Sequence, residues 1–173
     1  MSFLKGHKIN LRGLEPEDLE FVHMIENDTN FWHLSNTITP LSKFAIKTYL
    51  ESASEDIYTT KQLRLVIETI GGSAVGLIDL FDFDPYHKRA GLGIIIHKTE
   101  NQQKGAGSES IALLIDYAKS KLQLHQLYCN IMSSNVSSIA LFEKLGFEKT
   151  GEKKDWCWSA SGFENEYLMQ KIL

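Results

Sequence analysis

A glycine-containing segment, Gln102-Gln103-Lys104-Gly105-Ala106-Gly107, stands between an apolar strand pattern and a helical one. Glycine has no Cβ, so consecutive backbone amides can turn toward a single anion. A helix that begins at Gly105 would add unpaired N–H groups and a partial positive charge. Lys104 would add a full positive charge. The segment lacks the Lys-Ser/Thr of a P-loop and the third glycine of a dinucleotide fingerprint. It predicts a pyrophosphate site, with a purely structural turn as the alternative.

A second motif follows at 135–147, Asn-Val-Ser-Ser-Ile-Ala-Leu-Phe-Glu-Lys-Leu-Gly-Phe. Asn135 is a suitable helix cap, and Gly146 suits a helix end. Leu141 and Phe142 taken alone are typical of a core. Each of these features is common by itself. A helix of this composition at this distance after the glycine segment is an uncommon combination.

The elements that must position these motifs follow from residue periodicity. Period two predicts strands, and a 3.6-residue period predicts helices, in the order β-α-α-β-β-β-α-β-α-β-β. The expected strands are about 7–12, 63–68, 74–83, 89–97, 126–131, 148–158 and 162–171. The expected helices follow Pro16, span about 41–53, follow Gly105 and span 137–145. This order predicts a single α+β domain over residues 1–173, with a mixed, largely antiparallel sheet flanked by helices.

The composition of the 173 residues, 43% apolar and 23% charged, is that of an ordinary globular protein. No segment approaches the roughly 20 apolar residues of a membrane helix, and no signal peptide is visible, so a cytoplasmic location is expected. The net charge of −4, without a basic cluster, argues against nucleic acid. Cys129 and Cys157 are expected as reduced thiols, and the scattered histidines predict no metal site.

Together the two motifs, Gln-x-x-Gly-x-Gly and Asn-x-x-Ser-x-x-Leu-Phe-x-Lys-x-Gly-Phe, resemble the acetyl-CoA-binding half of the GNAT superfamily of N-acetyltransferases. The first strand ending in Leu11-Arg12 and the turn at 84–90 resemble the ribosomal-protein and spermidine acetyltransferase branch. The resemblance implies the GNAT fold, acetyl-CoA as co-substrate without a metal, direct attack of an amine on the thioester, and a homodimer.

The resemblance also implies roles for residues at matching positions. Ile94, Ile95 and Ile96 would form a splayed central strand, whose backbone amides would pair with the pantetheine and the acetyl carbonyl. The segment 102–107 would hold the pyrophosphate. Contacts along the pantetheine arm would come from Asn135, Phe142 and Lys144.

Two positions depart from the family pattern. Many members have a tyrosine at the position of Phe142, where it can protonate the leaving thiolate, and a glutamate at the position of Gly91, where it can accept a proton. Asp79 and Asp82 are the candidates for the missing base or for an amine anchor, because polyamine-acetylating relatives carry acids there. Residues three apart on an ideal strand point to opposite faces, so both can face one site only across a bulge. His97 and Tyr167 are weaker candidates.

Aromatic side chains are candidates for the wall of an amine pocket through cation–π contact, although clustered aromatics are also typical of a core. They are Phe31, Trp32 and His33, with Trp156 and Trp158. The acceptor is expected to be a polyamine, an amino acid, a peptide N-terminus or an aminoglycoside-like amine. Three alternatives keep fewer of these features: an inactive acyl-CoA sensor of the same fold, a transferase for a longer acyl group, and an unrelated α+β binding protein.

Overall fold

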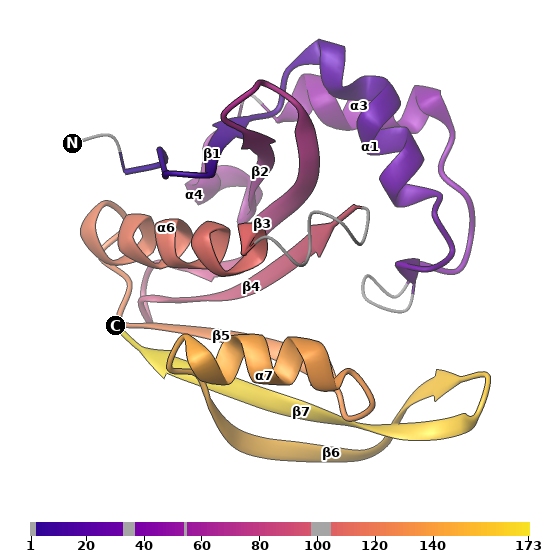
Figure 1. The fold of residues 1–173 in the computed structure, drawn as a ribbon, viewed down its shortest axis with the longest axis vertical. Helices are drawn as coiled ribbons and strands as arrows, with labels where there is room; N and C mark the ends of the chain where they lie inside the picture. Colours follow the sequence, from indigo (N-terminus) through magenta and orange to yellow (C-terminus); the bar gives the residue numbers. More distant parts are fainter. Residues whose placement is uncertain (1–2, 33–36, 54, 98–104) are drawn as a thin grey trace.

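A computed structural model of the protein describes residues 3–32, 37–53, 55–97 and 105–173. Over these residues the chain forms a seven-stranded sheet of order β1-β2-β3-β4-β5-β7-β6 (Figure 1). The strands are β1 Ile9–Gly13, β2 Leu63–Thr69, β3 Ala74–Asp84, β4 Arg89–Ile96, β5 Gln126–Met132, β6 Glu148–Ser159 and β7 Gly162–Ile172. The helical elements are η1 Pro16–Asp18, α1 Leu19–Glu26, α3 Lys43–Ser52, α4 Ile57–Thr60, α6 Ala106–Ser120 and α7 Val136–Lys144. None of the helices described is long and apolar enough to cross a membrane.

The pairing of β4 with β5 differs from that of the other neighbouring strands. Neighbouring strands are antiparallel throughout, except that β4 pairs with β5 in parallel. That pairing covers only Arg89–Gly91 against Gln126–Tyr128. Beyond Gly91 the two strands diverge, as Figure 1 shows. The sheet is therefore split between β4 and β5 beyond Gly91.

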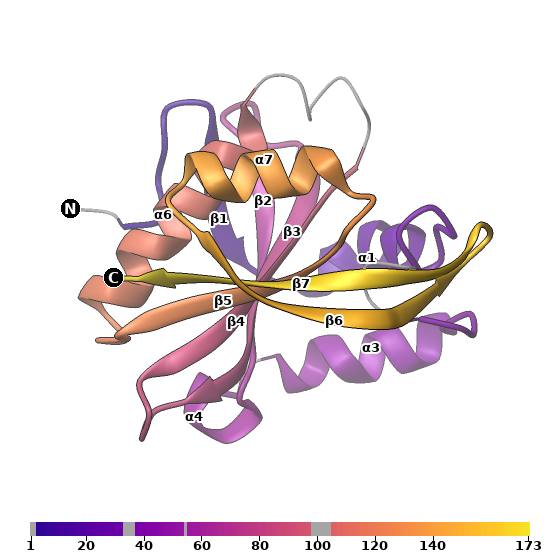
Figure 2. The same cartoon turned by 90° about the horizontal axis from the view of Figure 1, so that it is seen from below.

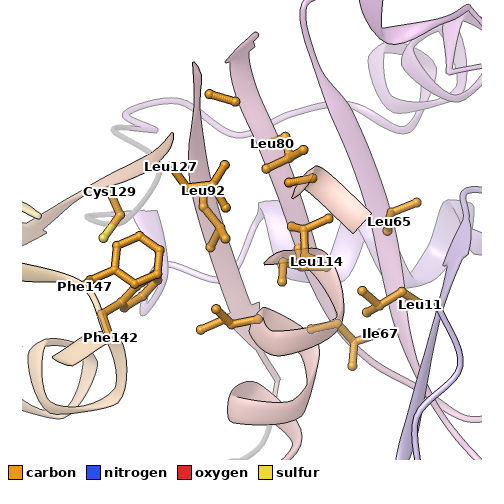
Figure 3. Packing of buried hydrophobic residues seen from close by; sticks show 14 of the residues in the cluster. Leu11, Leu65, Ile67, Leu80, Leu92, Leu114, Leu127, Cys129, Phe142 and Phe147 are labelled. Carbon is orange, nitrogen blue, oxygen red and sulfur yellow. The ribbon is translucent and has the colours of Figure 1, made fainter. Parts of the chain in front are cut away.

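Helices cover both faces of the sheet (Figure 2). On one face, Ile111 and Leu114 of α6 are fully buried in the main core with Leu80 and Leu92 of β3 and β4, seen in part in Figure 3. Phe147 is buried in the same core, on the side of α7 (Figure 3). The alternation of apolar residues along each strand thus places this face on α6 and α7.

The opposite face packs on α1 and α3 in a smaller core. Val22 and Ile25 of α1 and Ile46 of α3 are buried against Val66 and Leu77 of the sheet. Residues of β3 and β4 that alternate with the main core, from Leu77 through Asp79 on β3, lie on this face. Leu77 and Asp79 are therefore the β3 side chains on the face beside α1.

The predicted order of strands and long helices is confirmed. The short helix α4 was not predicted, because four residues hold no helical stripe; Asp56 caps it by accepting from the amides of Tyr58 and Thr59. α3 begins at Lys43, two residues later than the start expected from sequence, because Ser42 caps it through Ala45 N at 3.1 Å.

Candidate functional site

The split between β4 and β5 holds two adjoining cavities of about 310 and 350 Å³. Both are lined by Ile94 of β4 and by Asn135 and Ser138 at the start of α7, so they form one continuous hollow. The smaller cavity continues over Gly93, Cys129–Met132, Phe142, Lys153, Trp156 and Glu166, and the larger over Ile95, Ile96, Gly107, Leu141, Asn30 and Phe31. The hollow reaches from the start of α6 to the β6–β7 hairpin.

The glycine segment meets this hollow at the start of α6. Gly105 is the N-cap of the helix, with a φ of +81° that favours glycine, and Gly107 lines the larger cavity. Ala106 is buried beside them. Gln102, Gln103 and Lys104 lie outside the described residues. The described half of the segment thus brings a helix N-terminus to the hollow, which suits an anionic group.

The edge of β4 supplies the middle of the hollow. Ile94, Ile95 and Ile96 all line the larger cavity. Their strand pairs with β3 on one side, whereas its pairing with β5 has ended at Gly91. An extended ligand in the split can therefore align with this strand edge, as the resemblance implies.

Asn135 and Phe142 reach the hollow from α7, whereas Lys144 is exposed in the last turn of the helix and is not among the described lining residues. Asn135 caps α7, with Oδ1 accepting from Ser138 N at 3.2 Å, and it lines both cavities. Phe142 is 3% exposed and packs edge-on against Phe147, with ring centroids 5.0 Å apart. The aromatic ring at this position offers no proton.

Asp79 is tied into a network of ion pairs. Its Oδ2 lies 3.4 Å from Nη2 of Arg64 and 3.3 Å from Nε2 of Gln62, while Arg64 Nη1 donates to Glu26 at 2.6 Å. Burial alone would lower the pKa of Arg64, yet the carboxylates of Asp79 and Glu26 raise it above the ordinary value. Asp79 is not among the described residues that line the hollow.

Asp82 lies on the bulge that a shared site would require. The register of β3 against β4 shifts between Phe81 and Asp84, and Asp82 has a φ of +48°. Its Oδ2 accepts from the Tyr128 hydroxyl at 3.1 Å. Burial, together with this hydrogen bond to a carboxylate, raises the pKa of Tyr128 to about 12.

The surroundings of Asp82 differ from those of the β4–β5 hollow. Asp82 lines a separate open depression of about 450 Å³, together with Arg89 and Tyr128. The structure therefore places neither predicted carboxylate in the described lining of the hollow, and a role for either as base stays a prediction.

Trp32 contacts the C-terminal end of α1. Its Nε1 donates to the backbone oxygen of Glu26 at 2.9 Å. Its neighbours Asn30 and Phe31 line the larger cavity, whereas Trp156 of the β6–β7 hairpin lines the smaller one. Of the predicted aromatic wall, the structure brings Phe31 and Trp156 to the hollow, each to a different cavity. His33 lies outside the described residues.

A polar cluster in the smaller cavity was not predicted. It consists of Asn130 on β5, Lys153 on β6 and Glu166 on β7. The three residues come from three strands whose mutual register no sequence motif reports, so only the alternation along each strand could have indicated that they share a face. Among the described residues, no group of His, Cys, Asp or Glu gathers as metal ligands.

Comparison with known proteins gives the same picture. Residues 8–148 match the family described as acetyltransferase (GNAT) domain. Spermidine N(1)-acetyltransferase of Escherichia coli K12 is 33% identical over 150 residues, which are 85% of this chain and 76% of that protein. The Vibrio cholerae protein of the same name is 29% identical over 147 residues, 83% of this chain and 81% of that one.

Solved structures agree with this relationship. A crystal structure of the Vibrio cholerae spermidine N-acetyltransferase, in complex with CoA and spermine, superposes with a TM-score of 0.86 at 25% identity and covers 95% of each chain. A dodecameric structure of that enzyme superposes with a TM-score of 0.75 at 25% identity, covering 95% of this chain and 94% of that one.

Proposed function

The chain belongs to the GNAT acetyltransferase family, and from that premise we propose that it acetylates a primary amine of a polyamine. Acetyl-CoA is the co-substrate, and the reaction class is N-acetyl transfer. The observation that carries the polyamine assignment is the agreement over 95% of each chain with an enzyme bound to CoA and spermine. The hollow in this chain also carries a carboxylate, Glu166, on the side away from α6.

The residues present fit acetyl-CoA. The start of α6 at Gly105–Gly107 suits its pyrophosphate, because helix N–H groups and the helix dipole favour anions. The edge of β4 at Ile94–Ile96 suits its pantetheine amides, and Asn135 lies between the two cavities. Gln102, Gln103 and Lys104 are proposed to hold the pyrophosphate together with the start of α6, and Lys144, exposed beyond the hollow, is proposed as an outer contact.

The chemistry that acetyl-CoA supplies is an activated thioester. The neutral amine attacks its carbonyl carbon, the carbon–sulfur bond breaks, and the thiolate leaves. A thiol with a pKa of about 8.5 needs no strong acid to leave. Phe142 therefore costs rate without preventing the reaction, and catalysis rests on positioning and on donors at the carbonyl oxygen.

A thiol-release assay with a panel of amines tests the proposal. We expect turnover with spermidine and spermine to exceed turnover with amino acids, N-terminal peptides and aminoglycosides. Acetyl-CoA binding by calorimetry without turnover on any amine would instead favour the sensor of the same fold. Faster reaction with propionyl- or succinyl-CoA would favour the longer acyl group.

Self-association is also proposed, as a homodimer or a larger assembly, because a similar enzyme forms a dodecamer. The tip of the β6–β7 hairpin offers a surface for it: Trp158 and Phe163 are 72% and 65% exposed and pack edge-on at 4.9 Å. Light scattering should give a mass above the 19.7 kDa of one chain. Trp158→Ser should lower that mass if the hairpin tip is the interface.

A single domain and a cytoplasmic location complete the proposal. The described strands all belong to one sheet, which supports one domain. The two cysteines are free, which suits a reducing compartment.

A further inference from the structure

The ammonium group of Lys153, a residue that lines the smaller cavity, contacts three other side chains there. Nζ of Lys153 lies 2.6 Å from Oε1 of Glu166 and 3.3 Å from Oδ1 of Asn130. The same nitrogen lies 4.9 Å from the centroid of the Trp156 ring. A carboxylate, an amide oxygen and an aromatic face are the three groups that recognise an alkylammonium ion.

The local backbone is shaped to bring these groups together. The register of β6 against β7 shifts between Lys153 and Cys157, and Asp155 has a φ of +48°. Asp155 N donates to Oδ1 of Asn165 at 3.0 Å, which holds this bulge against β7. Without the bulge, Lys153 and Trp156 would point to opposite faces; with it, both line the same cavity.

The carboxylate is the least accessible member of the cluster. The Glu166 side chain is 13% exposed, against 37% for Lys153. A carboxylate removed from water to this degree needs a cationic partner. Lys153 extends from the more exposed side, so that partner can leave into solvent while Glu166 cannot.

We propose that Glu166, Asn130 and Trp156 form a subsite for a primary ammonium group of the acceptor amine. Lys153 of the same chain competes for this subsite, and the acceptor binds by displacing it. The proposal rests on the proposed function, since the subsite lies in the cavity that also holds Ile94 and Phe142. It names Glu166 as a binding residue for substrate and Lys153 as an internal competitor.

The proposal predicts opposite effects for the two members of one ion pair. Lys153→Met removes the competitor, so the KM for spermidine should fall roughly 3–10-fold, because apparent affinity scales with the fraction of open sites. Glu166→Gln removes the charged acceptor, and KM should rise roughly 10–100-fold. A merely structural ion pair would instead give the same direction of change in both variants.

Lys43→Met serves as the matched control. Lys43 forms an ion pair of similar length, 2.7 Å to Glu20, on the exposed surface of α1 and α3. This variant should leave KM unchanged. An unchanged or raised KM in Lys153→Met, with Lys43→Met unchanged, would overturn the proposal.

A binding test on the wild-type protein needs neither variants nor turnover. Sγ of Cys157 lies 3.6 Å from Oε2 of Glu166, so a ligand at Glu166 should change the rate at which iodoacetamide modifies Cys157. We expect saturable dependence on spermidine without acetyl-CoA, and none on NaCl at matched ionic strength. Saturation without any acetyl transfer would support the subsite and refute the proposed function. Acetyl transfer to spermidine with no saturable effect on Cys157 would overturn the subsite.

Discussion

At the scale of single residues, the enzyme lacks a side-chain acid at the position where many relatives have one. Phe142 is buried between the hollow and Phe147, and both rings belong to the main core. The family resemblance alone identified this departure, and that of Gly91, because Phe142 lies in the second motif and Gly91 directly follows the turn at 84–90. The structure adds that Gly91 faces the ring of Phe81, whose Cε2 lies 2.2 Å from where a Cβ would stand. A glutamate at Gly91 therefore has no room unless Phe81 moves.

Phe142→Tyr should raise kcat, because the added hydroxyl can protonate the leaving thiolate; general acids typically contribute about 10²–10⁴-fold. We expect a gain at or below the lower end of that range, roughly tenfold to a hundredfold, since the neighbouring ring restricts the hydroxyl. Phe147→Tyr is the control, because Phe147 is 2% exposed and is not among the described lining residues. It should lower stability without raising kcat. An unchanged kcat in Phe142→Tyr would mean that thiolate departure does not limit the rate.

Asp79→Asn should act mainly on stability. Arg64 would keep Glu26 at 2.6 Å but lose its second carboxylate, at a cost of roughly 1–3 kcal/mol in unfolding free energy. Urea unfolding measures this, and the exposed Asp82→Asn is the comparison, with little expected change. A fall in kcat above a hundredfold in either variant, at wild-type stability, would identify that residue as the base.

At the scale of elements, the site depends on how α6 begins and on where the pairing of β4 with β5 ends. The first feature was predicted, because glycine before an apolar helical stripe is a local signal. The second was not. Arg89–Gly91 and Gln126–Tyr128 are far apart in sequence, and nothing in their composition says that pairing stops after three residues. The cluster around Glu166 was missed for the same reason, since it depends on register and on the bulge at Asp155.

Gly105→Asp should weaken CoA binding more than tenfold, by placing a negative charge at the N-terminus of α6 and by straining a residue at φ +81°. Gly72→Asp separates the two effects. Gly72 has a similar φ of +84° but lies in the β2–β3 turn, with no atom within 4 Å of an added Cβ. It should show the strain alone, with CoA affinity unchanged. Calorimetric titration with CoA compares the two variants, and equal losses would argue against a pyrophosphate at α6.

At the scale of the whole molecule, two ionisable groups with raised pKa values, the buried Cys129 and the half-buried Tyr128, should limit stability at alkaline pH. Burial raises the pKa of the Cys129 thiol to about 12, and burial with the Asp82 hydrogen bond raises the pKa of Tyr128 to about 12. Unfolded thiols and phenols have pKa values of about 8.5 and 10. Between those values and 12 the unfolded chain binds fewer protons than the folded chain, so stability falls as pH rises.

The unfolding free energy should therefore be constant up to about pH 8.5 and decrease above it. The contribution of Cys129 to this decrease should be roughly 1 kcal/mol per pH unit. Urea unfolding at pH 7.5, 9, 10 and 11 measures the decline. Cys129→Ala should lower stability at pH 7.5, because it removes buried volume, yet flatten the slope above pH 8.5. A slope equal to that of the wild type would assign the decline to other groups.

The three-residue contact between β4 and β5 also makes the protein two half-sheets with a gap between them, β1 to β4 on one side and β5, β7 and β6 on the other. A co-substrate bound in that gap would lie between the two half-sheets, as a strand does, in addition to reacting. Its concentration then enters the folding equilibrium: at about 100 times its Kd it adds about 2.7 kcal/mol to stability. The supply of acetyl-CoA would thus influence what fraction of the copies is folded, in addition to how fast each copy works.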